Sequence, residues 1–167
     1  MVMNIQKFTQ KSIEAIQNAQ TISIENQNAQ IEQEHLLLSL LEQENSLIKE
    51  LIKKIGDEEA IEHEVRKIVS NKHKMTGGAR PNDGIYVSQD VDKILANAET
   101  TAKKMKDEYV SVEHIMLSIF DNANRELKDL FRTYNITKNE FLKVLSQVRG
   151  NTRVTTDNPE ETYDVLK

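Results

Sequence analysis

The chain has 167 residues, of which 38% are hydrophobic and 29% are charged, and its net charge is −5. No run approaches the ~18 apolar residues that a membrane-spanning helix needs, and no basic stripe suited to nucleic acid is present. The absence of cysteine excludes a disulfide framework, and only five glycines and two prolines leave few turn signals for a sheet protein. We therefore expect an acidic, helical, cytoplasmic protein that binds neither a membrane nor a nucleic acid.

An internal repeat organises the chain. Residues 34–41 (EHLLLSLL) return as residues 113–120 (EHIMLSIF), at an offset of 79 residues. Self-similarity at a fixed spacing is the signature of a repeated structural unit. The sequence therefore predicts a tandem, pseudo-twofold duplication, with a first copy over residues 8–70, a loop over 71–85 and a second copy over 86–149.

Each copy predicts a four-helix unit, so the fold class is all-α with about eight helices. The first helix of each copy carries an apolar stripe and follows an N-cap candidate, Thr9 in one copy and Ser88 in the other. The second segment of each copy, residues 34–42 and 113–121, is apolar almost all round. A helix without a polar face is buried, so we expect these two helices in the core.

Two pairs of equivalent residues give more specific expectations. Leu38 and Leu117 lie on the two apolar helices, and we expect both in the core. Gly56 and Asn135 follow the third helix of each copy, and glycine and asparagine most readily take the left-handed conformation after a helix.

The segment after the second copy has a different character. Residues 151–157 are polar, and Asn158-Pro159-Glu160 is typical of a helix start. A helix that begins so near the last residue suggests a segment that continues in a longer protein. We expect residues 1–149 to form the domain and residues 150–167 to form a linker.

No enzyme site stands out in the sequence. His35 and His114 lack a second metal ligand at helical spacing, and the chain has no glycine pattern of a P-loop. Because both histidines recur at equivalent positions, a structural role at the start of a buried helix is favoured. A small helical enzyme centred on them remains an alternative. Ser39 and Ser118 also recur, and we expect each to bond to a carbonyl one turn back in its own helix.

A binding module is therefore the favoured interpretation. Two related helical bundles leave a groove at their pseudo-twofold axis, and grooves between helices accept extended or helical apolar segments. No residue pattern indicates a cofactor or metal site in this chain.

The quoted residues resemble a known family. The paired Glu-His helices, the duplicated unit and the Tyr86-Val87-Ser88 start of the second copy are similar to the Clp amino-terminal (Clp R) domain of AAA+ unfoldases. The resemblance spans residues 4–149. The tail over residues 154–163 is similar to the segment that leads to the first ATPase module in ClpB-type disaggregases. A ClpC- or ClpA-type unfoldase that feeds a protease is the alternative, with the domain docking adaptors or substrates.

The resemblance implies a substrate-recognition domain without catalysis. Such a domain contacts exposed apolar segments of unfolded or aggregated clients and passes them to the hexameric ATPase rings of its own chain. ATP and magnesium would bind in those rings, and this segment would have no cofactor of its own. The isolated domain would be a monomer.

The resemblance also points to three residues. Family positions tied to client handling match Thr9, Asp107 and Glu113 here. Thr9 also fits an N-cap, and Glu113 fits a first-turn acid that Glu34 matches in the first copy. Asp107 corresponds to the uncharged Asn28, so the fold explains it least. We expect Asp107 and Glu113 to lie at or near an exposed turn, and apolar burial to dominate client binding.

Overall fold

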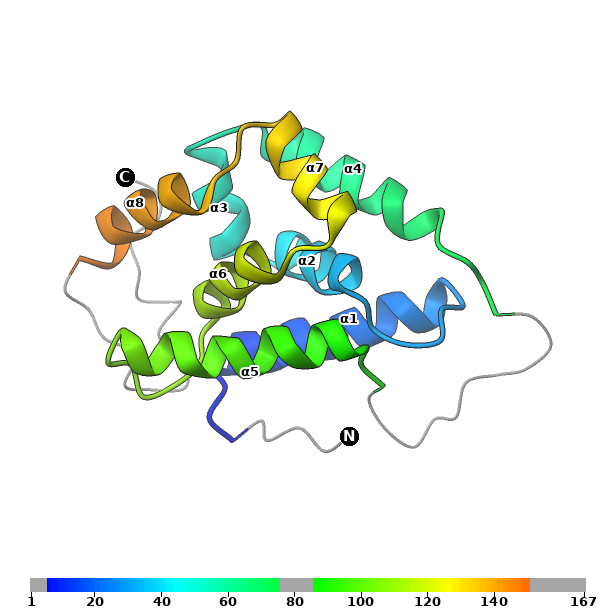
Figure 1. Ribbon diagram of the computed structural model, residues 1–167, viewed down its shortest axis with the longest axis horizontal. Coiled ribbons are helices and arrows are strands. Elements are labelled where there is room, and N and C mark those ends of the chain that lie inside the picture. The colour runs from blue at the N-terminus through cyan, green and yellow to red at the C-terminus, as the bar shows by residue number, and fades with distance from the viewer. Residues whose placement is uncertain (1–5, 76–85, 151–167) are drawn as a thin grey trace.

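The computed structural model describes residues 6–75 and 86–150, and within these ranges it is all-α. Its helices are α1 (Gln10–Glu25), α2 (Gln33–Glu42), α3 (Leu47–Lys53), α4 (Glu58–Ser70), α5 (Gln89–Lys104), α6 (Val112–Asn122), α7 (Arg125–Thr133) and α8 (Lys138–Arg149). The predicted duplication is confirmed, because the four helices α1–α4 of the first copy are followed by four equivalent helices, α5–α8, in the second copy (Figure 1). No helix among the described residues is both long and apolar enough to cross a membrane.

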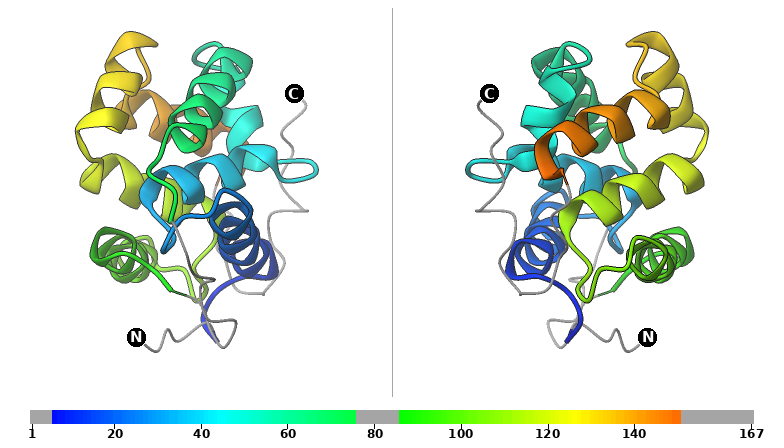
Figure 2. Two further views of the ribbon diagram at one scale, coloured as in Figure 1. Left: turned by 90° about the vertical axis from the view of Figure 1, so that its right-hand side faces the viewer. Right: turned by 90° about the vertical axis from the view of Figure 1, so that its left-hand side faces the viewer.

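Helices α2 and α6 form the centre of the fold. The antiparallel helices α1 and α5 cover one side of this central pair, and the other four helices cover the opposite side (Figures 1 and 2). Every residue of α2 before Glu42 is buried, and α6 is buried from Val112 to Ile119. The expectation of two buried apolar helices is therefore confirmed. Leu38 and Leu117 lie in the core, with exposed fractions of 3% and 2%.

Reciprocal main-chain pairs join the two copies. The Val110 N–H donates to the Lys7 carbonyl at 2.7 Å, and the Thr9 N–H donates to the Val110 carbonyl at 2.9 Å. The equivalent bonds join Ile31 N to Tyr86 O (2.8 Å) and Ser88 N to Ile31 O (3.0 Å). The residues just before the first helix of each copy therefore form a short parallel main-chain pairing with a segment of the other copy.

The two residues expected to take the left-handed conformation behave differently. Asn135 takes it, with a φ of 56°, whereas Gly56 does not. A Cβ atom at Gly56 would lie 2.6 Å from Cδ1 of Ile136, so any other residue would require this side chain to move. The prediction for Gly56 was wrong, because the φ of this residue is not positive. The sequence also did not reveal that Gln27 and Lys106 are left-handed, with φ values of 59° and 61°.

The core equivalents give a first prediction. Leu38→Ala and Leu117→Ala should each lower the free energy of unfolding by about 2–5 kcal/mol, because each removes buried methyl groups and leaves a cavity. Urea denaturation would measure both losses, with the exposed Ile24→Ala as the control. A near-zero loss at either leucine would contradict the equivalence of the two central helices.

Candidate functional site

Two buried histidines begin the central helices. His35 and His114 are the third residues of α2 and α6, and neither ring is exposed. Each Nδ1 accepts the backbone N–H of the N-cap residue, from Glu32 at 2.8 Å and from Ser111 at 2.9 Å. A histidine thus takes the place of the Glu or Gln of an ordinary capping box. The structural role predicted for both histidines is confirmed.

The other ring nitrogen of each histidine meets the residue that differs between the copies. Because Nδ1 accepts, we infer that Nε2 donates: to Asn28 Oδ1 at 2.8 Å from His35, and to Asp107 Oδ2 at 2.7 Å from His114. Asn28 and Asp107 lie two residues beyond the C-caps of α1 and α5. Their N–H groups bond back to Ser23 O (2.8 Å) and Ala102 O (2.9 Å), as in a Schellman motif. The helix ends therefore aim both side chains at the central helices.

The second copy builds a buried ionic cluster around Asp107. The Arg149 guanidinium binds both Asp107 oxygens, at 2.6 and 3.0 Å, and lies 3.5 Å from Glu113 Oε2. The side chains of Asp107, Glu113 and His114 are fully buried, and that of Arg149 is 4% exposed. We call these four residues the ionic cluster. It joins the end of α5 and the start of α6 to the end of α8 (Figure 1).

The first copy meets the same requirements with fewer charges. Asn28 Nδ2 donates to the His73 carbonyl at 3.0 Å, so this position needs no cation. Glu34, the equivalent of Glu113, bonds Lys72 at 3.1 Å and accepts from Asn124 Nδ2 at 2.8 Å. Lys72 is 19% exposed, so this ion pair lies nearer the solvent than the ionic cluster.

Thr9 is buried and caps α1. Its hydroxyl oxygen accepts the Ser12 N–H at 3.2 Å, and its O–H donates to Ser12 Oγ at 3.0 Å. Ser12 Oγ in turn donates to the Val110 carbonyl at 3.0 Å. Thr9 therefore connects the start of α1 to the segment between α5 and α6.

The turn beside Asp107 is exposed at Lys106 and Glu108, as expected, but the side chains of Asp107 and Glu113 are buried. Both carboxylates turn inward because His114 and Arg149 provide buried partners for them. Asp107 and Glu113 nevertheless share the Arg149 guanidinium, and the Thr9 N–H bonds the Val110 carbonyl in the segment between these two acids. Their role in client handling stays a prediction.

The two recurring serines also differ from expectation. Ser39 Oγ donates to the Ala15 carbonyl of α1 at 2.5 Å, and Ser118 Oγ donates to the Ile94 carbonyl of α5 at 2.6 Å. The expected bond within the same helix was wrong, because each serine faces a tightly packed neighbouring helix. These bonds fix α1 on α2 and α5 on α6.

A hollow of about 410 Å³ opens beside the ionic cluster. We call it the charged hollow, and it is lined by Lys7, Glu99, Ala102, Lys103, Asp107, Glu108 and Val110. Its accessible chemistry is two lysines and two glutamates around small apolar groups, so it is not the apolar groove that the sequence predicted. On the other side of the α5 end, a second hollow of about 310 Å³ is lined in part by Arg149 and Gly150.

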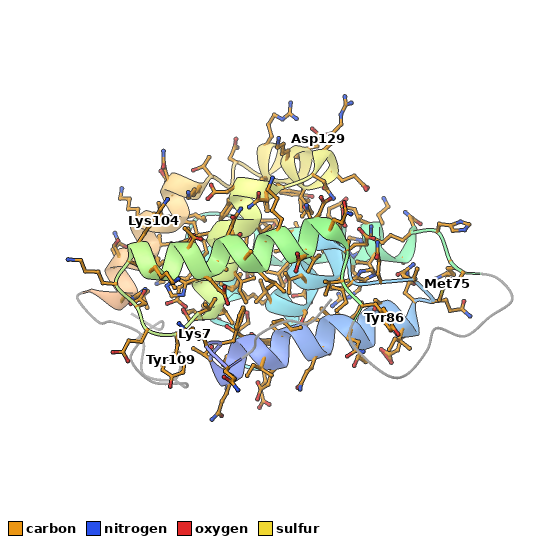
Figure 3. All side chains as sticks on the ribbon, turned by 60° about the horizontal axis from the view of Figure 1, so that its bottom comes forward. Lys7, Met75, Tyr86, Lys104, Tyr109 and Asp129 are labelled. Carbon is orange, nitrogen blue, oxygen red and sulfur yellow. The ribbon has the colours of Figure 1, made fainter. Side chains whose placement is uncertain are left out.

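The equivalent surface of the first copy is uncharged. The offset of 79 residues places Tyr86, Gln20, Ser23, Ile24, Asn28, Ala29 and Ile31 where the charged hollow has its lining residues. We call this surface the neutral end. Ile24 and Tyr86 are 42% and 38% exposed, and they are the exposed large hydrophobic residues of the described ranges. Figure 3 shows Lys7 on the left and Tyr86 on the right of the view, so the two surfaces lie apart.

A solvent-exposed network offers a contrast to the ionic cluster. Arg66, whose side chain is 52% exposed, bonds Glu62 at 2.7 Å and Glu42 at 3.1 Å, and Lys49 bonds Glu62 at 2.8 Å. Partial burial raises the pKa of Glu62, but the hydrogen bonds from Lys49 and Arg66 outweigh it and hold that pKa below its ordinary value. Exposed pairs of this kind typically contribute only ~0.2–1 kcal/mol.

The histidines give a second prediction. Glutamine can still accept the N-cap N–H, so His35→Gln and His114→Gln should remove mainly the bond from Nε2. The loss of unfolding free energy should be about 0.5–1.5 kcal/mol for His35 and about 1.5–3 kcal/mol for His114, whose partner is a carboxylate. Guanidinium denaturation of both variants would measure this difference. Equal losses would show that the charge of Asp107 does not strengthen the bond.

Curated relatives match nearly the whole chain. The chaperone protein ClpB of Clostridium tetani is 37% identical over 165 residues, covering 98% of this chain and 19% of that protein. The chaperone protein ClpB of Bacillus anthracis is 34% identical over 166 residues, covering 99% of this chain and 19% of that protein. The chain thus spans about a fifth of the length of these relatives.

Solved structures share the fold. The Hsp104 N-terminal domain from Candida albicans superposes with a TM-score of 0.80 at 22% identity, covering 93% of this chain and 99% of that one. A ClpV N-domain in complex with a VipB peptide gives a TM-score of 0.63 at 18% identity, covering 87% and 91%. Residues 7–134 match the sequence profile of the Clp repeat (R) N-terminal domain. The chain therefore belongs to the Clp repeat (R) N-terminal domain family.

Proposed function

We propose that this chain is the client-recognition domain of a ClpB-type disaggregase and that it contacts unfolded or aggregated protein at the charged hollow. One observation carries the location. Thr9, Asp107 and Glu113 match family positions tied to client handling. Asp107 and Val110 line the charged hollow, the Thr9 N–H bonds the Val110 carbonyl, and Glu113 shares the Arg149 guanidinium with Asp107. The matches to ClpB chaperones over almost the entire chain support the assignment to this type.

The chemistry of the charged hollow suits weak binding of polypeptide segments. Lys7 and Lys103 can pair with client acids, Glu99 and Glu108 with client bases, and Ala102 and Val110 provide small apolar contacts. Such exposed charges are screened beyond ~8 Å at physiological ionic strength. Client affinity should therefore fall as salt rises. Binding at an apolar groove would instead resist an increase in salt concentration.

A structural neighbour supports peptide binding by this fold. The ClpV N-domain was solved in complex with a VipB peptide. By analogy with that complex, this chain would bind and release client segments without catalysing a reaction. In a longer cytoplasmic protein, ATP and magnesium would act in separate ATPase rings, and this domain would deliver clients to them as a monomeric unit.

A second candidate surface is the neutral end. Ile24 and Tyr86 expose apolar area there, which suits uncharged client segments. The alternative function, adaptor docking in a ClpC- or ClpA-type unfoldase, would use a folded partner instead. A folded adaptor would bury a wider surface than one hollow offers, so its binding would perturb both ends of α5.

The third prediction locates the client. Titrating the 167-residue chain with a permanently unfolded, reduced and carboxymethylated protein should shift the amide resonances of Lys103, Glu108 and Val110. The dissociation constant should be micromolar or weaker and should rise several-fold between 50 and 500 mM salt. Lys103→Glu should weaken binding, whereas the control Ile24→Ser should not.

Three outcomes would contradict this prediction. Shifts confined to Gln20, Ile24 and Tyr86 would move the client site to the neutral end. Binding of folded adaptors, but not of unfolded protein, would favour the protease-feeding alternative. No shifts at millimolar client would exclude client recognition by this chain.

A further inference from the structure

The ionic cluster includes the last residue of α8. After Arg149, Gly150 has a positive φ of 58°, a conformation suited to glycine, and its N–H bonds to the Ser146 carbonyl at 2.8 Å. The sequence then continues through residues 151–167. Arg149 is therefore the side chain that attaches the end of the helical bundle to the segment between α5 and α6.

Asp107 connects this attachment to the charged hollow. Its carboxylate binds Arg149, while the residue itself lines the charged hollow together with Val110. Arg149 and Gly150 line the second hollow on the opposite side of the α5 end. The turn between α5 and α6 thus lies between the two hollows, and the Arg149 guanidinium joins it to the end of α8.

The two copies show that histidine capping does not require the charge on Asp107. Asn28 performs the same task for His35 without a charge. The equivalent of Arg149 in the first copy is Val69, because the offset is 80 residues in the fourth helix of each copy. The acid and the arginine therefore occur together in the second copy, and both are replaced by uncharged residues in the first. This pairing points to a joint task of Asp107 and Arg149.

We propose that Arg149 is a positioning residue for client binding. Its two-pronged bond to Asp107, and its contact with Glu113, hold the turn between α5 and α6 in the shape that forms the charged hollow. The same bonds secure the chain at Gly150. Asp107 and Glu113 then serve client handling through Arg149 and do not touch the client, since their carboxylates are fully buried. This inference rests on the proposed function.

A double-mutant cycle tests the proposal. The variants are Arg149→Met, Asp107→Asn, which copies Asn28, and the two combined. Two controls remove other cations: Lys72→Met breaks the ion pair with Glu34 in the first copy, and Arg66→Met breaks the surface network. The readouts are the affinity for the unfolded carboxymethylated protein and the hydrogen-exchange rate of the Gly150 amide under native conditions.

We expect each single variant of the pair to weaken client binding at least fivefold and to speed Gly150 exchange at least tenfold. The double variant should be no worse than either single one, because the two residues act as a unit. Both controls should stay within twofold of the wild-type chain in both readouts, even where they lower global stability.

Client binding that is lost in Asp107→Asn but kept in Arg149→Met would overturn the proposal in favour of direct client contact by Asp107. If Arg149→Met fails to fold, Arg149→Lys keeps the charge and loses the two-pronged geometry. Wild-type affinity and exchange in that variant would also overturn the proposal. If the wild-type chain binds no client, the proposed function fails, and Gly150 exchange still decides whether Arg149 secures the chain end.

Discussion

Burying the start of a helix removes water from backbone N–H groups that have no partner inside the helix, and this chain does so at both α2 and α6. Capping by His35 and His114 is one response to that constraint. The acids Glu34 and Glu113, each one position earlier in the helix, gain from the helix dipole and pair with the cations Lys72 and Arg149. The buried polar residues His35, His114, Glu34 and Glu113 therefore follow from the burial of two whole helices.

The duplicated unit solves this problem in two ways. The first copy uses Asn28 and a lysine near the solvent, and the second uses Asp107 and a buried arginine. A buried ion pair often gives no more stability than neutral or apolar groups would, because both charges must leave water. Its value lies in fixed geometry, and the copy that carries it is the one whose end forms the charged hollow. The uncharged copy presents Ile24 and Tyr86 instead.

The sequence predicted the fold more completely than the site. Helical spacing and the 79-residue repeat were enough for the all-α duplication and for the burial of Leu38 and Leu117, because both signals depend only on the spacing of residue types along the chain. Arg149 lies 42 residues from Asp107 along the chain, and no local pattern links them. Ser39 was misplaced for the same reason, since its acceptor lies 24 residues away in another helix.

The candidate residues themselves came only from family resemblance. Periodicity indicates that a position is on a helix start, but it does not distinguish an acid in solvent from an acid that faces a buried arginine. The resemblance placed Asp107 and Glu113 correctly near the turn between α5 and α6 and gave no information on their burial. The boundary at residue 149 and the linker over residues 150–167 remain predictions, because residues 151–167 lie outside the described ranges.

The reciprocal pairing of the two copies also affects how the protein is made. The start of α1 is completed by Val110, which is synthesised 98 residues after Ser12. At ~5–20 residues per second, the ribosome needs about 5–20 s to produce that partner. During this interval of translation, the Thr9 N–H and the Ser12 hydroxyl at the start of α1 lack their native acceptor, the Val110 carbonyl.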